Sequence, residues 1–199
     1  MEINIQKNKK KFEKWCKGYI VSKENTKNLD KFLKYLETTD FYTAPASNKF
    51  HLSCEGGLCQ HTINVAKRLF EESNLYYEEN DTKKPELKEK LFLVAALHDL
   101  CKINYYHEID GKDTTQKKYV VDNELPLDHG VKSLYIAQKF FELSEEQAIA
   151  IRWHMGFSDA SVKGGNCDIG NAFKKYPLAV LLNIADTKAT LAEQQADIF

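Results

Sequence analysis

Two histidines stand on the apolar faces of segments with helical periodicity. His61 shares its face with Leu58 and Val65, and His98 follows Leu91 at helical spacing, so both imidazoles are expected to point inward. Imidazole can hold a metal ion, transfer a proton or simply hydrogen-bond within a core. A lone inward histidine is more often a core residue than a ligand, so neither one by itself indicates a site.

Two aspartates accompany these histidines on apolar stretches. Asp99 directly follows His98, about 100° around the expected helix, and lies between Leu97 and Leu100, where helix capping explains it poorly. Asp186 is expected on the apolar face of the last helix. A buried carboxylate is costly unless it is paired or bound to a cation. Together the four residues favour a metal site, and ligands without thiolate suit Mn, Fe, Ni, Zn or Mg without selecting among them.

The segments around these four residues resemble one family. The motifs EGGLCQH at 55–61, LHDLCK at 97–102 and NIAD at 183–186 are similar to those of the HD-domain superfamily of metal-dependent phosphohydrolases. That family arranges a His, a His-Asp pair and a distant Asp on helices around a metal. The resemblance runs from Phe41 to Thr190. It implies an all-α HD-domain helical bundle and one ligand set: His61, His98, Asp99 and Asp186.

Two further histidines extend the resemblance. His129 opens an expected helix and His154 ends another, between the His-Asp pair and the last Asp. HD proteins with histidines at both places resemble the subset that holds two metals, with Asp99 bridging them. The alternatives are an ordinary helix-start residue at His129 and, at His154, a helix-end residue favoured by the macrodipole. One or two divalent ions are therefore expected.

The loop that precedes the first ligand carries another histidine. The stretch TAPASNKFHLSCEGGL, which contains His51, resembles a branch of HD hydrolases related to a bacterial 3′–5′ exoribonuclease. His51 is expected to face substrate or metal; a hydrogen bond that anchors the loop is an equal alternative. That exoribonuclease has an additional nucleic-acid-binding barrel, and no segment here supplies one, so large processive RNA substrates are less expected.

The implied chemistry is hydrolysis of a phosphate ester by a metal-activated water. Asp99 would orient or deprotonate that water. Lys102, one turn beyond His98, could neutralise a phosphate oxygen, although a surface lysine with a snorkelling stem is the alternative. Arg152 is a weaker phosphate candidate, because residues i and i+2 diverge on a helix and His154 is two residues away. Cys101 is interpreted as a packing residue.

The elements that must position these side chains are mostly helices in one domain, residues 1–199. A helical pair over residues 1–40 precedes an aperiodic active-site loop at 41–57, and residues 103–125 predict one small β-hairpin insertion. Ser144 and Gln147 form the pattern of a capping box. Gly164, Gly165 and Gly170 predict a mobile loop. Further helices are expected at these positions: 58–72, 85–100, 129–142, 145–155 and 177–192.

Composition excludes several other classes. The 199 residues have a net charge of −1, which argues against a duplex-DNA partner, and the two arginines cannot form a multi-arginine phosphate clamp. The five cysteines include no C-x-x-C pair. The N-terminus lacks the apolar run of a signal peptide, and no apolar stretch approaches the roughly 20 residues that span a bilayer. A soluble, cytoplasmic protein without a membrane partner is expected.

Three functions remain open. The first is a phosphohydrolase acting on a small phosphorylated substrate, a nucleotide or nucleotide-like monoester. The second is a phosphodiesterase or short-oligonucleotide 3′–5′ exonuclease. The third is a non-catalytic metal-binding or nucleotide-binding module, which a complete ligand set disfavours. The hairpin beside the His-Asp pair could act as a lid or as the contact of a homodimer.

Overall fold

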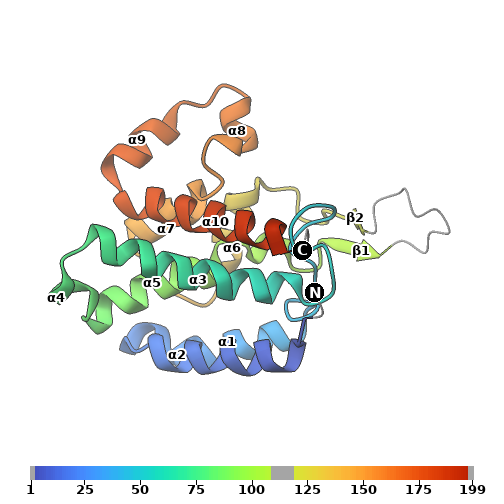
Figure 1. Ribbon diagram of the computed structural model, residues 1–199, viewed down its shortest axis with the longest axis horizontal. Coiled ribbons are helices and arrows are strands. Elements are labelled where there is room, and N and C mark those ends of the chain that lie inside the picture. The colour runs from blue at the N-terminus through green and yellow to red at the C-terminus, as the bar shows by residue number, and fades with distance from the viewer. Residues whose placement is uncertain (1–2, 109–118, 197–199) are drawn as a thin grey trace.

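The structure is a computed structural model that describes residues 3–108 and 119–196. The described chain is mostly helical with one two-stranded hairpin, so the expected all-α class with a small β-hairpin is confirmed (Figure 1). No helix in the described ranges is long and apolar enough to cross a membrane. The longer helices are α1 (Ile5–Tyr19), α2 (Lys23–Glu37), α3 (Gly57–Tyr76), α5 (Pro85–Leu97), α6 (His129–Ala137), α7 (Glu145–Trp153) and α10 (Pro177–Ala196).

Helix α5 is the centre of the bundle. Every residue from 91 to 97 is buried, as expected for a helix that is apolar all round and enclosed by its neighbours. Helices α3, α6, α7 and α10 contact it on several sides, and α10 also packs along α3 (Figure 1). The C-terminal end of α5 therefore lies inside the protein, where the His-Asp pair follows it.

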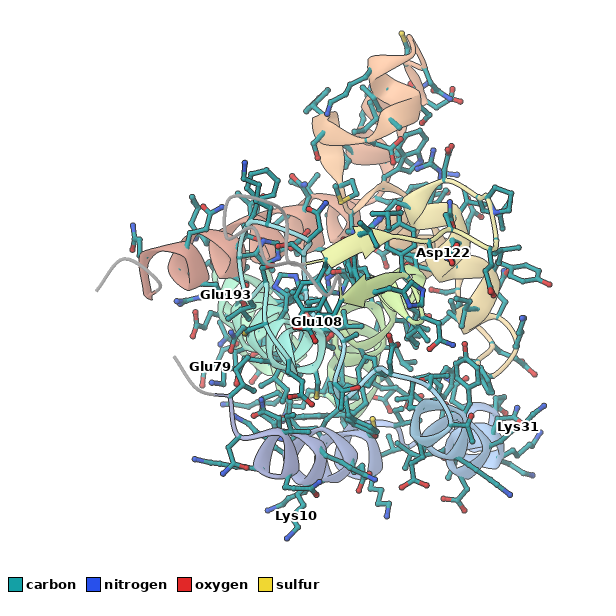
Figure 2. All side chains as sticks on the ribbon, turned by 90° about the vertical axis from the view of Figure 1, so that its right-hand side faces the viewer. Lys10, Lys31, Glu79, Glu108, Asp122 and Glu193 are labelled. Carbon is teal, nitrogen blue, oxygen red and sulfur yellow. The ribbon has the colours of Figure 1, made fainter. Side chains whose placement is uncertain are left out.

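Helices α1 and α2 form an outer layer beneath α3 and α5 (Figure 1). Phe12 is buried against Phe41 and Phe92, with ring centroids 5.1 and 6.3 Å away, while Lys10 and Lys31 project from the opposite face (Figure 2). The amphipathic pattern of the first 40 residues thus corresponds to two helices that cover the core. Beyond them, residues 38–56 form turns without helix or strand.

The hairpin consists of β1 (Tyr106–Glu108) and β2 (Tyr119–Val121). The strands are antiparallel, with Tyr106 opposite Val121 and Glu108 opposite Tyr119. They extend away from the helices (Figure 1). The predicted hairpin is confirmed at its strands, and its predicted turn lies in residues 109–118, outside the described residues.

The segment expected as a mobile glycine loop contains two short helices, α8 (Ala160–Lys163) and α9 (Asp168–Lys175). Asp159 is the N-cap of α8 and accepts from Ser161 N, and Asn166, one residue before the N-cap of α9, accepts from Asp168 N. The glycines drew the prediction away from these two helix starts. Between α3 and α5 lies α4 (Glu79–Thr82), and the 3₁₀ turns are η1 (Leu100–Lys102) and η2 (Gly156–Ser158).

Glu89 of α5 joins the outer layer to the core. Its buried carboxylate accepts hydrogen bonds from Val21 N, Ser22 N, Ser22 Oγ and Asn25 Nδ2, at 2.6–3.1 Å. Burial alone would raise the pKa of Glu89, but the donors of Ser22, Asn25 and Val21 outweigh it and lower the pKa. The N-terminus of α2 is thus held by a charge from another helix.

Replacing Glu89 with Gln turns an amide NH₂ toward some of these donors. We expect Glu89→Gln to lower the free energy of unfolding by about 1.5–3 kcal/mol at pH 7, measured by urea denaturation. Because the folded pKa is depressed, this stabilisation is present above the ordinary glutamate pKa and is lost as the pH falls below about 4. The exposed Glu86→Gln on the same helix should change stability by less than about 0.5 kcal/mol. Equal losses in the two variants would contradict this role.

Candidate metal centre

Five histidines from separate elements meet beside the C-terminal end of α5. Their ring centroids follow one another at 4.8 Å from His51 to His61, 5.5 Å from His61 to His98, 5.1 Å from His98 to His154 and 5.2 Å from His154 to His129. His51 comes from the loop before α3 and His61 from α3 itself. His129 begins α6, and His98 and His154 directly follow α5 and α7. The structure therefore brings together every histidine that the motif analysis selected.

Four of these rings have a buried nitrogen without a hydrogen-bond partner. Within residues 3–108 and 119–196, the buried side-chain nitrogens and oxygens left unpaired are Nε2 of His51, His61, His98 and His154. An unpaired buried polar atom costs roughly 1–3 kcal/mol, and four in one place require a common explanation. One or two bound cations would satisfy the nitrogens of His61, His98 and His154.

The opposite nitrogens fix the orientation of the rings. His98 Nδ1 donates to the carbonyl of Ala95 at 2.8 Å, and His154 Nδ1 donates to the carbonyl of Ile151 at 2.7 Å. A carbonyl can only accept, so Nδ1 carries the proton in both rings and the Nε2 lone pair is free for a metal. Each histidine follows the last residue of its helix, where carbonyls lack helical partners.

Glu193 of α10 fixes the orientation of the His61 ring in the same way, by pairing with its Nδ1 atom. Its carboxylate lies 2.9 Å from His61 Nδ1 and accepts from Asn64 Nδ2 at 2.8 Å (Figure 2). A carboxylate behind a metal-binding histidine sets its tautomer and raises its basicity. Motif reasoning missed Glu193. The available signal was its position seven residues after Asp186, which is two turns along the same face.

The Asp99 carboxylate separates the imidazoles into two groups. Oδ1 lies 2.8 Å from His129 Nε2 and 3.6 Å from His154 Nε2. Oδ2 lies 3.4 Å from His98 Nε2 and 3.6 Å from His61 Nε2. Burial opposes the charge, but the adjacent cationic and imidazole groups hold the pKa of Asp99 well below its usual range, so the carboxylate is ionised. One oxygen is available to each group.

Potential ligand atoms lie close together on both sides of Asp99. Those of His61, His98 and Asp186 lie within 4.8 Å of one another, and those of Asp99, Cys101 and His129 do the same. His154 Nε2 is near the second set, 3.6 Å from Asp99 Oδ1. Asp186 Oδ1 is 3.1 Å from His61 Nε2, without the direction of a hydrogen bond.

Imidazole nitrogen and carboxylate oxygen are ligands that divalent transition metals accept, so the residues present fit such an ion. The negative charges around His61 favour a cation as well. Burial disfavours its imidazolium, but Glu193 and Asp186 outweigh that effect and raise the pKa of His61 to about 10. A divalent ion would compete with that proton.

Cys101 lies beside the second group. Its Sγ is 3.3 Å from both ring nitrogens of His129, which places the sulfur over the ring face. Burial raises the pKa of the Cys101 thiol to about 12, so the thiol is neutral at ordinary pH.

Lys102 lies in the same centre. Its Nζ is 2.7 Å from Asp99 Oδ2, and the residue is buried. Burial disfavours the ammonium, but the charge of Asp99 outweighs it and raises the pKa of Lys102. A permanent positive charge is therefore present next to the shared carboxylate.

A cavity of about 470 Å³ gives access to these groups. Five of the predicted site residues line it: His51, Asp99, Lys102, His129 and Asp186. Its volume is within the range of small-molecule sites. Asp99, His129 and Asp186 of the candidate metal centre line it, so a ligand in the cavity would contact these three side chains directly.

Arg152 does not line this cavity. Its guanidinium donates to Asp159 at 2.8 Å and to Ser161 at 2.7 Å, and it stacks 4.0 Å from the Trp153 ring. Arg152 and His154 are two residues apart at the end of α7, so their side chains point in different directions, which explains this placement. The structure therefore does not bring Arg152 to the substrate cavity that the sequence analysis considered for it.

The His98-Asp99 pair also differs from expectation. The periodicity predicted a helix through Leu100, but α5 ends at Leu97, and Asp99 has φ −110° and ψ 20°. A continuous helix would separate the two side chains by about 100°. The end of the helix instead lets both face the same centre.

Two glycines allow the surrounding elements to approach. A Cβ on Gly130, directly after His129, would lie 2.1 Å from the carbonyl oxygen of Arg152, so only glycine lets α6 begin against the end of α7. A Cβ on Gly57 would lie 2.1 Å from the carbonyl oxygen of Leu52. The first contact brings His129 toward His154, and the second holds the loop of His51 against α3.

A family comparison agrees with this geometry. A model described as HD domain matches residues 58–191, more than half of the chain, so the chain belongs to the HD domain family. HD domains bind divalent metals. No curated protein and no solved structure matches the chain. His51 and its loop precede the matched residues.

Glu193→Gln removes the charge behind His61 while keeping the side-chain size. We expect the affinity for Mn²⁺ or Zn²⁺ to fall about 10-fold to 100-fold, measured by calorimetric titration, because the ligand becomes less basic and its tautomer less fixed. Glu72→Gln is the matched control, since Glu72 joins the same two helices through Lys188. Unchanged affinity in Glu193→Gln would contradict the assigned role.

Proposed function

We propose that this protein is a metal-dependent phosphohydrolase that cleaves a phosphate ester of a nucleotide or nucleotide-like substrate. The observation that carries the proposal is the convergence of the buried, unpaired Nε2 atoms of His61, His98 and His154 on Asp99, which lines one cavity together with Asp186. Membership of the HD domain family supports it.

In this proposal the first ion is held by His61, His98, Asp99 and Asp186, and a second by Asp99, His129 and His154. When bound, such an ion lowers the pKa of a coordinated water toward neutrality and polarises a phosphoryl oxygen. The family and the ligand chemistry leave the metal open among Mn, Fe, Ni, Zn and Mg.

The protein's own side chains supply the remaining steps. Asp99 is ionised, so its carboxylate accepts a hydrogen bond from the attacking water and orients it. Lys102 donates an N–H to a phosphate oxygen and balances its charge. His51 is half-buried, and desolvation lowers its pKa to about 4, so its neutral ring offers a hydrogen bond to substrate without adding charge.

A phosphodiesterase or short-oligonucleotide 3′–5′ exonuclease is the second candidate. The division of ligands on either side of Asp99 favours it, since two-ion centres stabilise both the attacking and the leaving oxygen of a displacement. As part of this second proposal, the protein is related to the exoribonuclease branch of HD hydrolases. The complete ligand set disfavours a non-catalytic module that binds metal or nucleotide without turnover.

Replacing both His98 and Asp99 with Ala should abolish metal binding and lower phosphatase activity by more than about 100-fold, because two ligands of the centre are removed. Metal content by elemental analysis and helical circular dichroism are the measurements. The double variant His107→Ala/Asp122→Ala is the matched control, since it removes an exposed His-Asp pair from the hairpin. Metal-stimulated hydrolysis that survives in the His98/Asp99 variant would overturn the proposal, and Asp99→Asn serves if that variant does not fold.

Two chromogenic substrates distinguish a phosphomonoesterase from a phosphodiesterase. A monoesterase should hydrolyse p-nitrophenyl phosphate faster than bis-p-nitrophenyl phosphate under each tested metal, because a monoester offers the cation centre a second charge. The reverse order would favour the diesterase candidate.

A further inference from the structure

We propose that Phe50 and Leu191 form an apolar clamp that holds the base of a nucleoside monophosphate whose single phosphate lies on the metal centre. This inference rests on the proposed function and names the part of the substrate that the metal centre does not contact. Both residues line the cavity that contains Asp99 and Lys102.

The exposure of the two side chains indicates a ligand contact. Phe50 is 67% exposed and Leu191 is 53% exposed, and both line the cavity that also contains Asp99 and Lys102. They come from different elements, the loop before α3 and the helix α10. Large apolar side chains exposed in a cavity beside a few polar groups are suited to bind a flat apolar group. Tyr105 and Tyr106 add aromatic surface to the same lining.

Phe50 is presented on an ordered turn. Ser47 Oγ accepts from Phe50 N at 2.8 Å and donates to the carbonyl of His51 at 2.9 Å. Ala46 N donates to the carbonyl of Leu52 at 3.1 Å and closes the loop. The backbone of Phe50 is thus fixed before any ligand binds, which lowers the entropy cost of stacking a ring on it.

The charge of the cavity limits the number of phosphate groups. Among the described residues that line it, Lys102 is the one lysine or arginine, and its ammonium is paired with Asp99. Polyphosphate chains are usually held by several basic groups. The single lysine and the cation centre together match one phosphate group, and the remaining lining is aromatic, aliphatic or neutral polar.

Other large apolar side chains are exposed on the surface but do not line the cavity. Phe157 is 71% exposed, but it does not line the cavity, and its ring lies 6.1 Å from that of Phe173. Leu75 is 83% exposed and lies at the far end of α3 from His61. Both are matched controls for the loss of an exposed apolar side chain.

The first test compares adenosine monophosphate, as its 5′ and 3′ isomers, with ribose 5-phosphate, which has the phosphate without the base. Phe50→Ala and Leu191→Ala should lower kcat/KM for the nucleotide about 5-fold to 100-fold, the range of one lost base stack. Ribose 5-phosphate hydrolysis should change less than about 2-fold. Phe50→Trp should restore nucleotide activity, while Phe157→Ala and Leu75→Ala should leave it unchanged. Equal losses on both substrates would overturn the clamp, as would a preference for the triphosphate.

A second test does not need turnover. Adenosine carries the base without a phosphate, so saturation-transfer NMR reports its base contacts even if no ester is hydrolysed. We expect saturation of the adenine protons with the wild type and Phe50→Trp and its loss with Phe50→Ala. If no phosphate ester is hydrolysed with any metal, the proposed function fails, and adenine contacts that depend on Phe50 still support the clamp. Absence of such contacts overturns it.

Discussion

The rest of the site depends on one buried charge, the carboxylate of Asp99. An isolated carboxylate is very costly in a protein interior, and this one is compensated on all sides. Lys102 pairs with one oxygen, and His129 hydrogen-bonds to the other. The same two oxygens face separate groups of imidazoles, so the interaction that makes the charge tolerable also divides the centre in two. Helices α6 and α7 contribute to the site by placing His129 and His154 beside Asp99, which follows α5.

Helix termini supply the orientation of the ligands. His98 and His154 stand directly after α5 and α7, and each ring donates from Nδ1 to a carbonyl three residues earlier. One hydrogen bond satisfies a free helical carbonyl and also fixes the tautomer that leaves Nε2 unprotonated. His61 lies inside α3, where no carbonyl is free, and Glu193 provides the equivalent partner from α10. Two different local solutions therefore produce the same result, a ring nitrogen directed at the centre.

Much of the fold was predictable because its pattern is local. The helical periodicity of apolar residues predicted α1, α2, α3 and α10, although α3 continues to Tyr76 and α10 to Ala196, beyond the predicted ends at 72 and 192, and the Ser144 capping box is present. The errors also have local causes. The apolar run through Leu100 concealed the end of α5, because a hydrophobic pattern continues through a helix cap. Glycines 164, 165 and 170 suggested a loop, although α8 ends just before Gly164 and α9 contains Gly170.

The sequence by itself determined the identity of the chemistry-bearing residues, since the His-Asp pair and its spaced partners are a matter of residue type and order. Tertiary structure decided which of them meet. In the folded chain, Arg152 pairs with Asp159 and Glu193 pairs with Nδ1 of His61. The two oxygens of Asp99 contact different neighbours. The last two outcomes depend on contacts between residues far apart in the chain, as does the close approach of α6 and α7 at Gly130. Periodicity fixes the face of a residue on its own helix, but only packing determines what that face meets.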